Sequence, residues 1–196
     1  MTEIEFRSDV TVELVRSSAR DADVLFAARV STQGEQTLDV AMNQDTEVEK
    51  RDKRLLNYLM RDRHGSPFEH NSMTFYVQAP IFVFREFMRH RIASYNEESG
   101  RYRELRPVFY VPGPERKLIQ VGKPGAYDFE DGTVEQTALV TQETMAVTRS
   151  AYESYKRMLE AGVAREAARI VLPVNIYSSM YVTMNSRSLM NFSVLW

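Results

Sequence analysis

Residues 73–92 read MTFYVQAPIFVFREFMRHRI, and the hydrophobic period of this stretch changes halfway along. From Met73 to Gln78, apolar side chains alternate with more polar ones, which is typical of a β-strand. Pro80 is favourable in the first turn of a helix, and apolar residues then recur at helical spacing up to Ile92. A strand followed at once by a helix indicates a fold that mixes the two.

The rest of the chain continues this mixture. Helices are predicted at 20–30, 46–61, 133–161 and 164–171 and from 186 onward, extended segments at 10–15, 105–111 and 174–184, and an exposed loop at 113–132. Because strands and helices do not alternate strictly, we predict an α+β fold, with residues 1–196 forming a single domain. We expect a mainly antiparallel sheet flanked by helices, and one long helix near residues 133–161. Apolar residues fall at every seventh position of that helix, which fits either a seam with another subunit or internal core packing.

The composition excludes several classes of protein. The net charge is −2 and 43% of the residues are hydrophobic, as in an ordinary globular protein with no charge-driven affinity for nucleic acid or membrane. Without cysteine there is no disulfide, thiolate zinc site or thiol nucleophile. No long apolar run or signal-like N-terminus occurs, so we expect a cytoplasmic protein. His64 and His70 lack a clear third ligand, so no metal is expected.

The segment from Arg85 to Arg106 carries the richest chemistry. It contains six arginines, four glutamates and one histidine, and a polar stretch with two tyrosines lies inside it. Guanidinium and hydroxyl groups bind phosphate, carboxylate and amide groups bind sugar and base edges, and aromatic rings stack on bases. This mixture suits a nucleotide site, although an RNA-binding loop would look much the same.

The spacing in residues 89–101, Arg-His-Arg-x-x-Ser-x-Asn-Glu-x-Ser-x-Arg, resembles the signature RHR-x-x-S-x-N-E-x-S-x-R of flavin-dependent thymidylate synthases. Further segments that look like the same family are Ala27–Ser31, Pro67–His70, Ala79–Val83, Arg169–Pro173 and Asn185–Phe192. The resemblance implies reductive methylation of deoxyuridylate (dUMP) to thymidylate (dTMP), with FAD as cofactor, methylenetetrahydrofolate as carbon donor and NADPH as reductant. It also implies a homotetramer with sites shared between subunits. The alternative is an RNA- or nucleotide-binding protein without catalysis, including an inactive relative of the enzyme.

The resemblance also assigns roles to individual residues. The residues expected to bind FAD are Ser66, Arg89, His90, Arg91, Glu97, Asn185, Arg187 and Asn191. Those expected to bind dUMP are Glu86, Arg89, Glu97, Glu98, Ser99, Gly100, Arg101 and Arg169. We favour Arg101 and Ser99 for the phosphate, because a guanidinium can grip it with two bonds. His64 and His70 are second-rank candidates beside the flavin. The alternative to a site role for Asn185 and Asn191 is that they are a helix cap and a turn residue.

The C-terminal end departs from the family pattern. Where the family has an arginine that activates the uracil ring, this chain has Trp196, so no catalytic residue is assigned with certainty. An indole has one N–H donor and no charge, so it cannot stabilise an anionic ring. The family pattern also continues into an extension after this position.

We therefore predict weak turnover with FAD and nucleotide binding retained. A chain with Arg at position 196 and the usual extension should turn over about two to three orders of magnitude faster, because it restores the charge-stabilising donor. Steady-state assays of the two chains measure this difference, and equal rates would refute the prediction.

Overall fold

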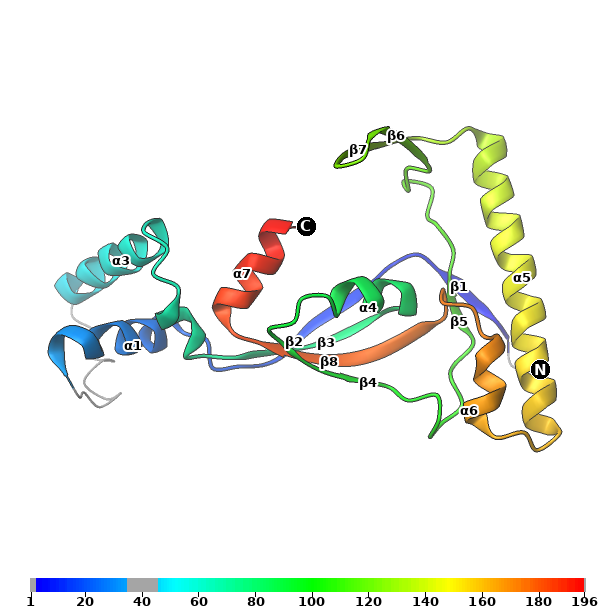
Figure 1. Cartoon of the computed structure of the whole chain (residues 1–196), viewed down its shortest axis with the longest axis horizontal. Helices are drawn as coiled ribbons and strands as arrows, with labels where there is room; N and C mark the ends of the chain where they lie inside the picture. The colour runs from blue at the N-terminus through cyan, green and yellow to red at the C-terminus, as the bar shows by residue number, and fades with distance from the viewer. Residues whose placement is uncertain (1–2, 35–45, 196) are drawn as a thin grey trace. The chain divides into compact units, whose positions relative to one another are not determined.

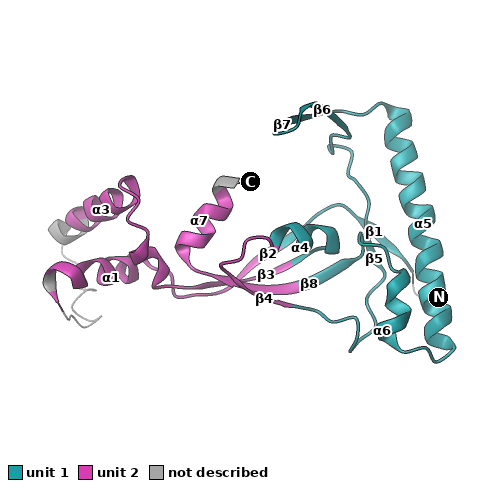
Figure 2. Ribbon diagram, in the orientation of Figure 1, with its two compact units in different colours: residues 1–11, 78–87, 97–179 teal, residues 12–77, 88–96, 180–196 magenta. Residues whose placement is uncertain are grey.

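The computed structural model describes residues 3–34 and 46–195 (Figure 1). The chain divides into two compact units, shown in different colours in Figure 2. Unit 1 comprises Met1–Thr11, Gln78–Phe87 and Glu97–Ser179, and unit 2 comprises Val12–Val77, Met88–Asn96 and Met180–Trp196. We describe each unit by itself.

Helices and strands are interleaved along the chain. In order they are β1 (Glu5–Arg7), β2 (Thr11–Ser17), α1 (Asp21–Gln33), α3 (Thr46–Arg61), the 3-10 helix η1 (Ser66–Glu69), β3 (Met73–Pro80), α4 (Ile81–Phe87), β4 (Ser94–Glu97), β5 (Val108–Tyr110), β6 (Ile119–Lys123), β7 (Ala126–Glu130), α5 (Val134–Glu160), α6 (Arg165–Ala168), the 3-10 helix η2 (Arg169–Val171), β8 (Tyr177–Met184) and α7 (Ser186–Leu195). The α+β prediction is confirmed, and the long helix is observed as α5. Across residues 3–34 and 46–195, no helix is both long and apolar enough to cross a membrane.

The largest sheet has the strand order β2-β3-β8-β4. The backbone N–H of Ser18 donates to the carbonyl of Ser72 over 2.9 Å, which joins the end of β2 to the start of β3. The hydroxyl groups of Thr74 and Thr183 lie 2.9 Å apart, which joins the start of β3 to the end of β8. Both neighbours of β3 therefore run antiparallel to it, and the predicted antiparallel character holds there. The small β1–β5 pair is parallel.

In unit 1, the core forms between α5 and the residues around β5. Thr133 caps α5 with a reciprocal pair of hydrogen bonds to Gln136, of 3.2 and 2.8 Å. Tyr152 and Tyr155 are buried in one cluster with Phe109, whose ring meets that of Tyr152 edge-on at 5.8 Å. Tyr152 belongs to the seventh-residue series, so at this position the series serves core packing within the chain.

In unit 2, helices α1, α3 and α7 meet around η1. Val24, Leu59 and Phe68 are buried together, and Met190 packs against them. Leu59 belongs to the helical apolar series that the sequence shows before Arg61, so the amphipathic pattern of α3 is confirmed. The wall of a pocket, described below, is built from this cluster.

Two predicted segments differ from the structure. The helix expected over residues 80–92 ends at Phe87, because the chain turns at Met88 and Arg89. Beyond that turn, the carbonyl of His90 accepts a 2.6 Å hydrogen bond from the Tyr95 hydroxyl. The loop expected over 113–132 contains the antiparallel hairpin β6–β7. Its turn depends on Gly122, where φ is +93° and a Cβ would lie 2.4 Å from the carbonyl oxygen of Ala126. The glycines that suggested a loop are the residues that permit the hairpin.

A buried tyrosine in unit 1 makes the free energy of unfolding vary with pH in the alkaline range. The Tyr177 hydroxyl donates to the carbonyl of Asp9 over 2.7 Å, and burial raises the pKa of Tyr177 to about 12. The raised pKa contributes stability below the ordinary tyrosine pKa of about 10, and that contribution is lost as the pH rises through 12. Denaturant unfolding should therefore show the free energy of unfolding falling by up to about 3 kcal/mol between these pH values because of this group.

The variant Tyr177→Phe should remove that part of the fall, because it cannot ionise. Tyr102→Phe, at a side chain that is 79% exposed, is the matched control and should leave the alkaline profile unchanged. A wild-type profile that persists in Tyr177→Phe would contradict the assignment.

Candidate functional site

The two sets of expected site residues divide between the two units. Of the dUMP set, all but Arg89 lie in unit 1. Of the FAD set, all but Glu97 lie in unit 2. Each unit therefore carries one coherent group of candidates.

In unit 1, a tight turn at the end of β4 presents the polar segment. The backbone N–H groups of Tyr102 and Arg103 both reach the carbonyl of Ser99, at 3.1 and 3.3 Å. The Ser99 hydroxyl accepts a 3.3 Å hydrogen bond from the backbone N–H of Arg101. The turn is thus closed by its own backbone, and the exposed Arg101 side chain projects from it.

Arg169 lies against this turn, although it comes almost seventy residues later. Gly100 is buried, and a Cβ placed on it would lie 3.4 Å from Cδ of Arg169 and 3.1 Å from Cδ1 of Leu105. Gly100 therefore lies beside the aliphatic part of Arg169, at the start of η2, and Leu105 is the side chain that a Cβ there would crowd. Arg169 and the expected phosphate ligands therefore belong to one arrangement.

Glutamates accompany the arginines of the turn. Oε1 of Glu98 lies 3.0 Å from Nε of Arg103, and the Glu98 side chain is only 15% exposed. Oε1 of Glu98 has no hydrogen bond of good geometry among the described atoms, so the charge of Arg103 is its main compensation. Arg101 lies 3.4 Å from Glu166 in an exposed pair, which an incoming anion can replace at little cost. The sequence analysis did not select Arg103.

The Arg-His-Arg triplet lies in the turn after α4, not on a helix. Arg89 and Arg91 are exposed, while the ring of His90 meets the ring of Phe192 edge-on, with centroids 4.7 Å apart. This contact ties His90 to α7, the helix that carries Arg187 and Asn191. Three expected FAD ligands, His90, Arg187 and Asn191, therefore lie in the same part of unit 2.

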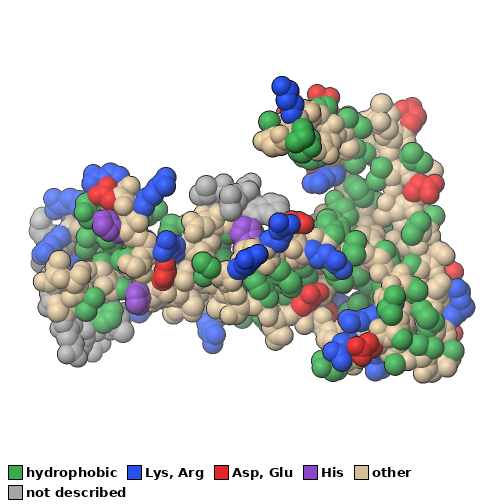
Figure 3. Space-filling view, viewed as in Figure 1, with side chains coloured by type: hydrophobic (Ala, Val, Ile, Leu, Met, Phe, Trp, Pro, Cys, Tyr) green, Lys and Arg blue, Asp and Glu red, His purple; other side chains and the backbone are tan. Residues whose placement is uncertain are grey.

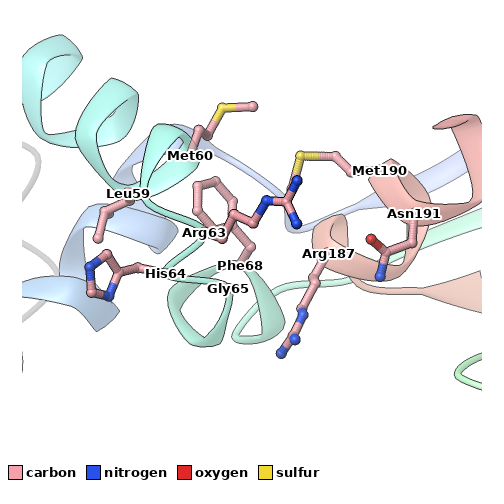
Figure 4. Close-up of a pocket in the computed structure, with 9 residues that line it drawn as sticks. All are labelled: Leu59, Met60, Arg63, His64, Gly65, Phe68, Arg187, Met190 and Asn191. Atoms are coloured by element: carbon pink, nitrogen blue, oxygen red, sulfur yellow. The ribbon is translucent and has the colours of Figure 1, made fainter.

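A pocket of about 730 Å³ opens in unit 2 beside α7. Figure 4 shows its lining, which consists of Leu59, Met60, Arg63, His64, Gly65, Phe68, Arg187, Met190 and Asn191. Its walls are mainly apolar, and its polar groups are two guanidiniums, an imidazole and an amide. A volume of 300–1,000 Å³ with few polar groups is usual for a cofactor site.

Two FAD candidates line this pocket, and a third has a clear local role. Arg187 packs over Gly65 and forms an ion pair with Glu69. Asn185 accepts a 2.9 Å hydrogen bond through Oδ1 from the backbone N–H of Ser188, so its side chain caps α7. Ser66 begins η1 directly after Gly65 and is exposed. Trp196 lies outside the described residues.

Of the second-rank histidines, only His64 lines the pocket. It is exposed and its ring stacks on Tyr58 with a centroid distance of 5.5 Å, whereas His70 is exposed and outside the lining. Within residues 3–34 and 46–195, no three His, Asp or Glu side chains gather as a metal site would require.

Sequence reasoning missed most of the pocket wall. Leu59, Met60, Phe68 and Met190 look like ordinary core residues, and all of them except the exposed Met60 do contribute to the core of unit 2 or its edge. Arg63 was missed because it lies outside every recognisable motif. No sequence signal distinguishes a core leucine from one that also faces a cavity.

The protein is therefore of the α+β class. One unit has a turn whose arginines suit an anion such as phosphate, and the other has a mainly apolar pocket with arginines at its edge. Comparison with known proteins agrees, because the family model described as thymidylate synthase complementing protein matches residues 13–195. The chain belongs to this family.

Individual relatives are close. The flavin-dependent thymidylate synthase of Streptomyces coelicolor is 67% identical over 190 residues, which is 96% of this chain and 76% of the relative. That of Tropheryma whipplei is 60% identical over 187 residues, which is 95% of this chain and 76% of the relative. The crystal structure of a UMP/dUMP methylase, PolB from Streptomyces cacaoi, bound with 5-Br dUMP, is 53% identical with a TM-score of 0.85, and the match covers 96% of this chain and 79% of that one.

The close approach at Gly100 generates a prediction. Gly100→Ala should displace Leu105 by a few tenths of an ångström, because the new methyl group would lie closer to that side chain than ordinary contact allows, and it would also touch Cδ of Arg169 at 3.4 Å. We expect dUMP affinity to fall about tenfold, while flavin content stays unchanged, since the FAD candidates lie almost wholly in the other unit.

Isothermal titration with dUMP measures this, with Gly132→Ala as the control. That glycine is similarly crowded, 3.0 Å from Cδ1 of Leu118, but it lies outside the candidate site. Equal losses in both variants would show that the effect comes from general disturbance of the fold.

Proposed function

We propose that this chain catalyses the reductive methylation of dUMP to dTMP, with FAD as cofactor, methylenetetrahydrofolate as carbon donor and NADPH as reductant. The observation that carries the proposal is the approach of Arg169 to the turn of Ser99 and Arg101, which joins two segments that resemble one enzyme family. Membership of that family and the printed activities of its close relatives support it.

The arginine turn of unit 1 suits the nucleotide monophosphate. Arg101 offers a planar fork for two phosphate oxygens, and the hydroxyl of Ser99 adds a donor two residues away. Arg169 brings a second guanidinium toward the same turn, so a doubly charged phosphate meets two positive charges. Glu98, held beside Arg103, is a hydrogen-bond acceptor for the O–H group of a sugar or the N–H group of a base edge.

The pocket of unit 2 fits a flavin. Its apolar wall, which includes Phe68 and Met190, suits a flat heteroaromatic ring, while Arg187 and Asn191 provide polar contacts at its edge. When bound, FAD supplies the hydride that reduces the transferred carbon unit. The chain has no cysteine, so its residues bind and orient the pyrimidine without forming a covalent sulfur adduct.

We further propose that residues 1–196 act as one domain and assemble as a cytoplasmic homotetramer with shared sites, without nucleic acid or membrane partners. Exposed apolar side chains along α5 support a subunit contact. Val134, Leu139 and Val147 are each more than half exposed, and a shallow groove lies between α5 and Val171. Exposure of this much apolar surface on one helix is typical of an interface.

A flavin titration tests the proposed function. The purified protein should be yellow, its flavin absorbance should shift on addition of dUMP, and NADPH should bleach it. Arg101→Ala should keep the flavin but raise the dUMP concentration needed for the shift about 10- to 100-fold, because a charge-assisted phosphate contact is lost.

Arg116→Ala, at an exposed arginine of the same unit, is the control and should titrate like wild type. A colourless protein that binds RNA with steep salt dependence would overturn the proposal in favour of the non-catalytic alternative.

A further inference from the structure

Helix α3 ends in an unusual backbone conformation at Arg63. The backbone N–H of Arg63 donates to the carbonyl of Met60 over 3.2 Å, and that of His64 to the carbonyl of Leu59 over 2.8 Å. These two bonds form a Schellman motif, whose residue in the left-handed region is usually glycine. Arg63 occupies it with φ at +57° and is the one non-glycine residue of positive φ in the described part of the chain.

This conformation is unfavourable for an arginine. The Cβ of an L-residue crowds the following carbonyl oxygen in the left-handed region, and glycine avoids this contact. Strained residues of this kind persist where the surroundings hold them, and they cluster at ligand-binding sites. The position of Arg63 therefore calls for a function that glycine cannot perform.

The Arg63 side chain lies on the pocket of unit 2. In the view of Figure 4 it extends over the pocket in the direction of Met190, whereas the Arg187 side chain points away from Met190. Within residues 3–34 and 46–195, Arg63 makes no ion pair, while Arg187 is paired with Glu69 and Arg61 with Asp62. Arg63 thus supplies positive charge to the pocket that no carboxylate of the described chain compensates.

The surrounding charge favours an anion at this edge. Figure 3 shows Lys and Arg side chains gathered over α3, the helix that Arg63 follows. Apart from the Asn191 amide, the other walls of the pocket are apolar, so a charged part of a ligand finds its charged partners at the edge formed by Arg63 and Arg187.

We propose that Arg63 binds a phosphate group of a dinucleotide held in this pocket. A guanidinium matches two phosphate oxygens at once, and a dinucleotide combines the flat ring that suits the apolar wall with phosphates for its edge. The inference rests on the proposed function, which supplies two such ligands, FAD and NADPH. Arg63 is absent from the set of residues that the family signature selects.

The test uses two substitutions at this position and one control. Arg63→Gly removes the charge and installs the residue that the backbone prefers, so the Tm should rise by about 2–4 °C. At the same time, the Kd for FAD or the KM for NADPH should rise about 10- to 100-fold through loss of a charged hydrogen bond. Arg63→Lys keeps the charge and should lose less affinity.

The control is Arg61→Gln, which removes an exposed arginine at the same helix end that does not line the pocket. It should leave both ligand constants unchanged. Opposite movements of stability and affinity in Arg63→Gly separate ligand binding from a structural role, because loss of a structural contact would lower both.

The measurements also identify the source of the phosphate. A weaker Kd for FAD, measured by flavin fluorescence, assigns the flavin diphosphate, and a higher KM for NADPH with FAD affinity unchanged assigns the reductant. Ligand constants within twofold of wild type, a fall in Tm, or a change confined to methylenetetrahydrofolate would overturn the inference. Wild-type protein that binds no flavin would overturn the proposed function, and the inference about Arg63 with it.

Discussion

Pairing of arginine with glutamate is the interaction on which the candidate residues of each unit depend. Arg103 compensates the nearly buried Glu98 in unit 1, and Glu69 holds Arg187 against Gly65 in unit 2. Pairs that are largely open to water contribute little to stability, typically below about 1 kcal/mol. Their effect here is to orient side chains. A weakly held guanidinium can exchange its carboxylate for a phosphate, which binds more strongly.

The sequence predicted the secondary structure where local chemistry decides it. The helices expected at 46–61 and from 133 onward depend on side chains a few residues apart, and the structure has α3 at Thr46–Arg61 and α5 at Val134–Glu160 with Thr133 as its N-cap. The helix after Pro80 is shorter than predicted: its apolar period continues to Ile92, but α4 ends at Phe87. Periodicity does not show where the backbone leaves the helix. The hairpin at 119–130 differs from the predicted loop because Gly122 and Gly125, whose type favours a loop, also permit the turn between two strands.

In the candidate site too, the sequence predicts what a local motif identifies and not what tertiary packing brings together. The signature at 89–101 identifies the turn of unit 1, but nothing in it predicts that Arg169 lies beside Gly100 of that turn. The pocket of unit 2 was even less predictable. Its apolar wall is the edge of a hydrophobic core, and Arg63 enters it only because α3 ends in a left-handed residue. Backbone dihedral angles at a single position are not encoded in residue spacing.

The absence of cysteine explains why so much of the site consists of arginine. A thiol nucleophile would fix the pyrimidine by a covalent bond, so that the protein would need fewer contacts to orient it. Without one, orientation must come from noncovalent contacts, and a planar guanidinium restricts a phosphate more than a point charge does. The chain contains 20 arginines and 5 lysines, and the end of α3 accepts one of these arginines, Arg63, in a left-handed conformation where glycine would be easier. A fold that accepts backbone strain to place a cation is suited to ligands that are positioned by their negative charge.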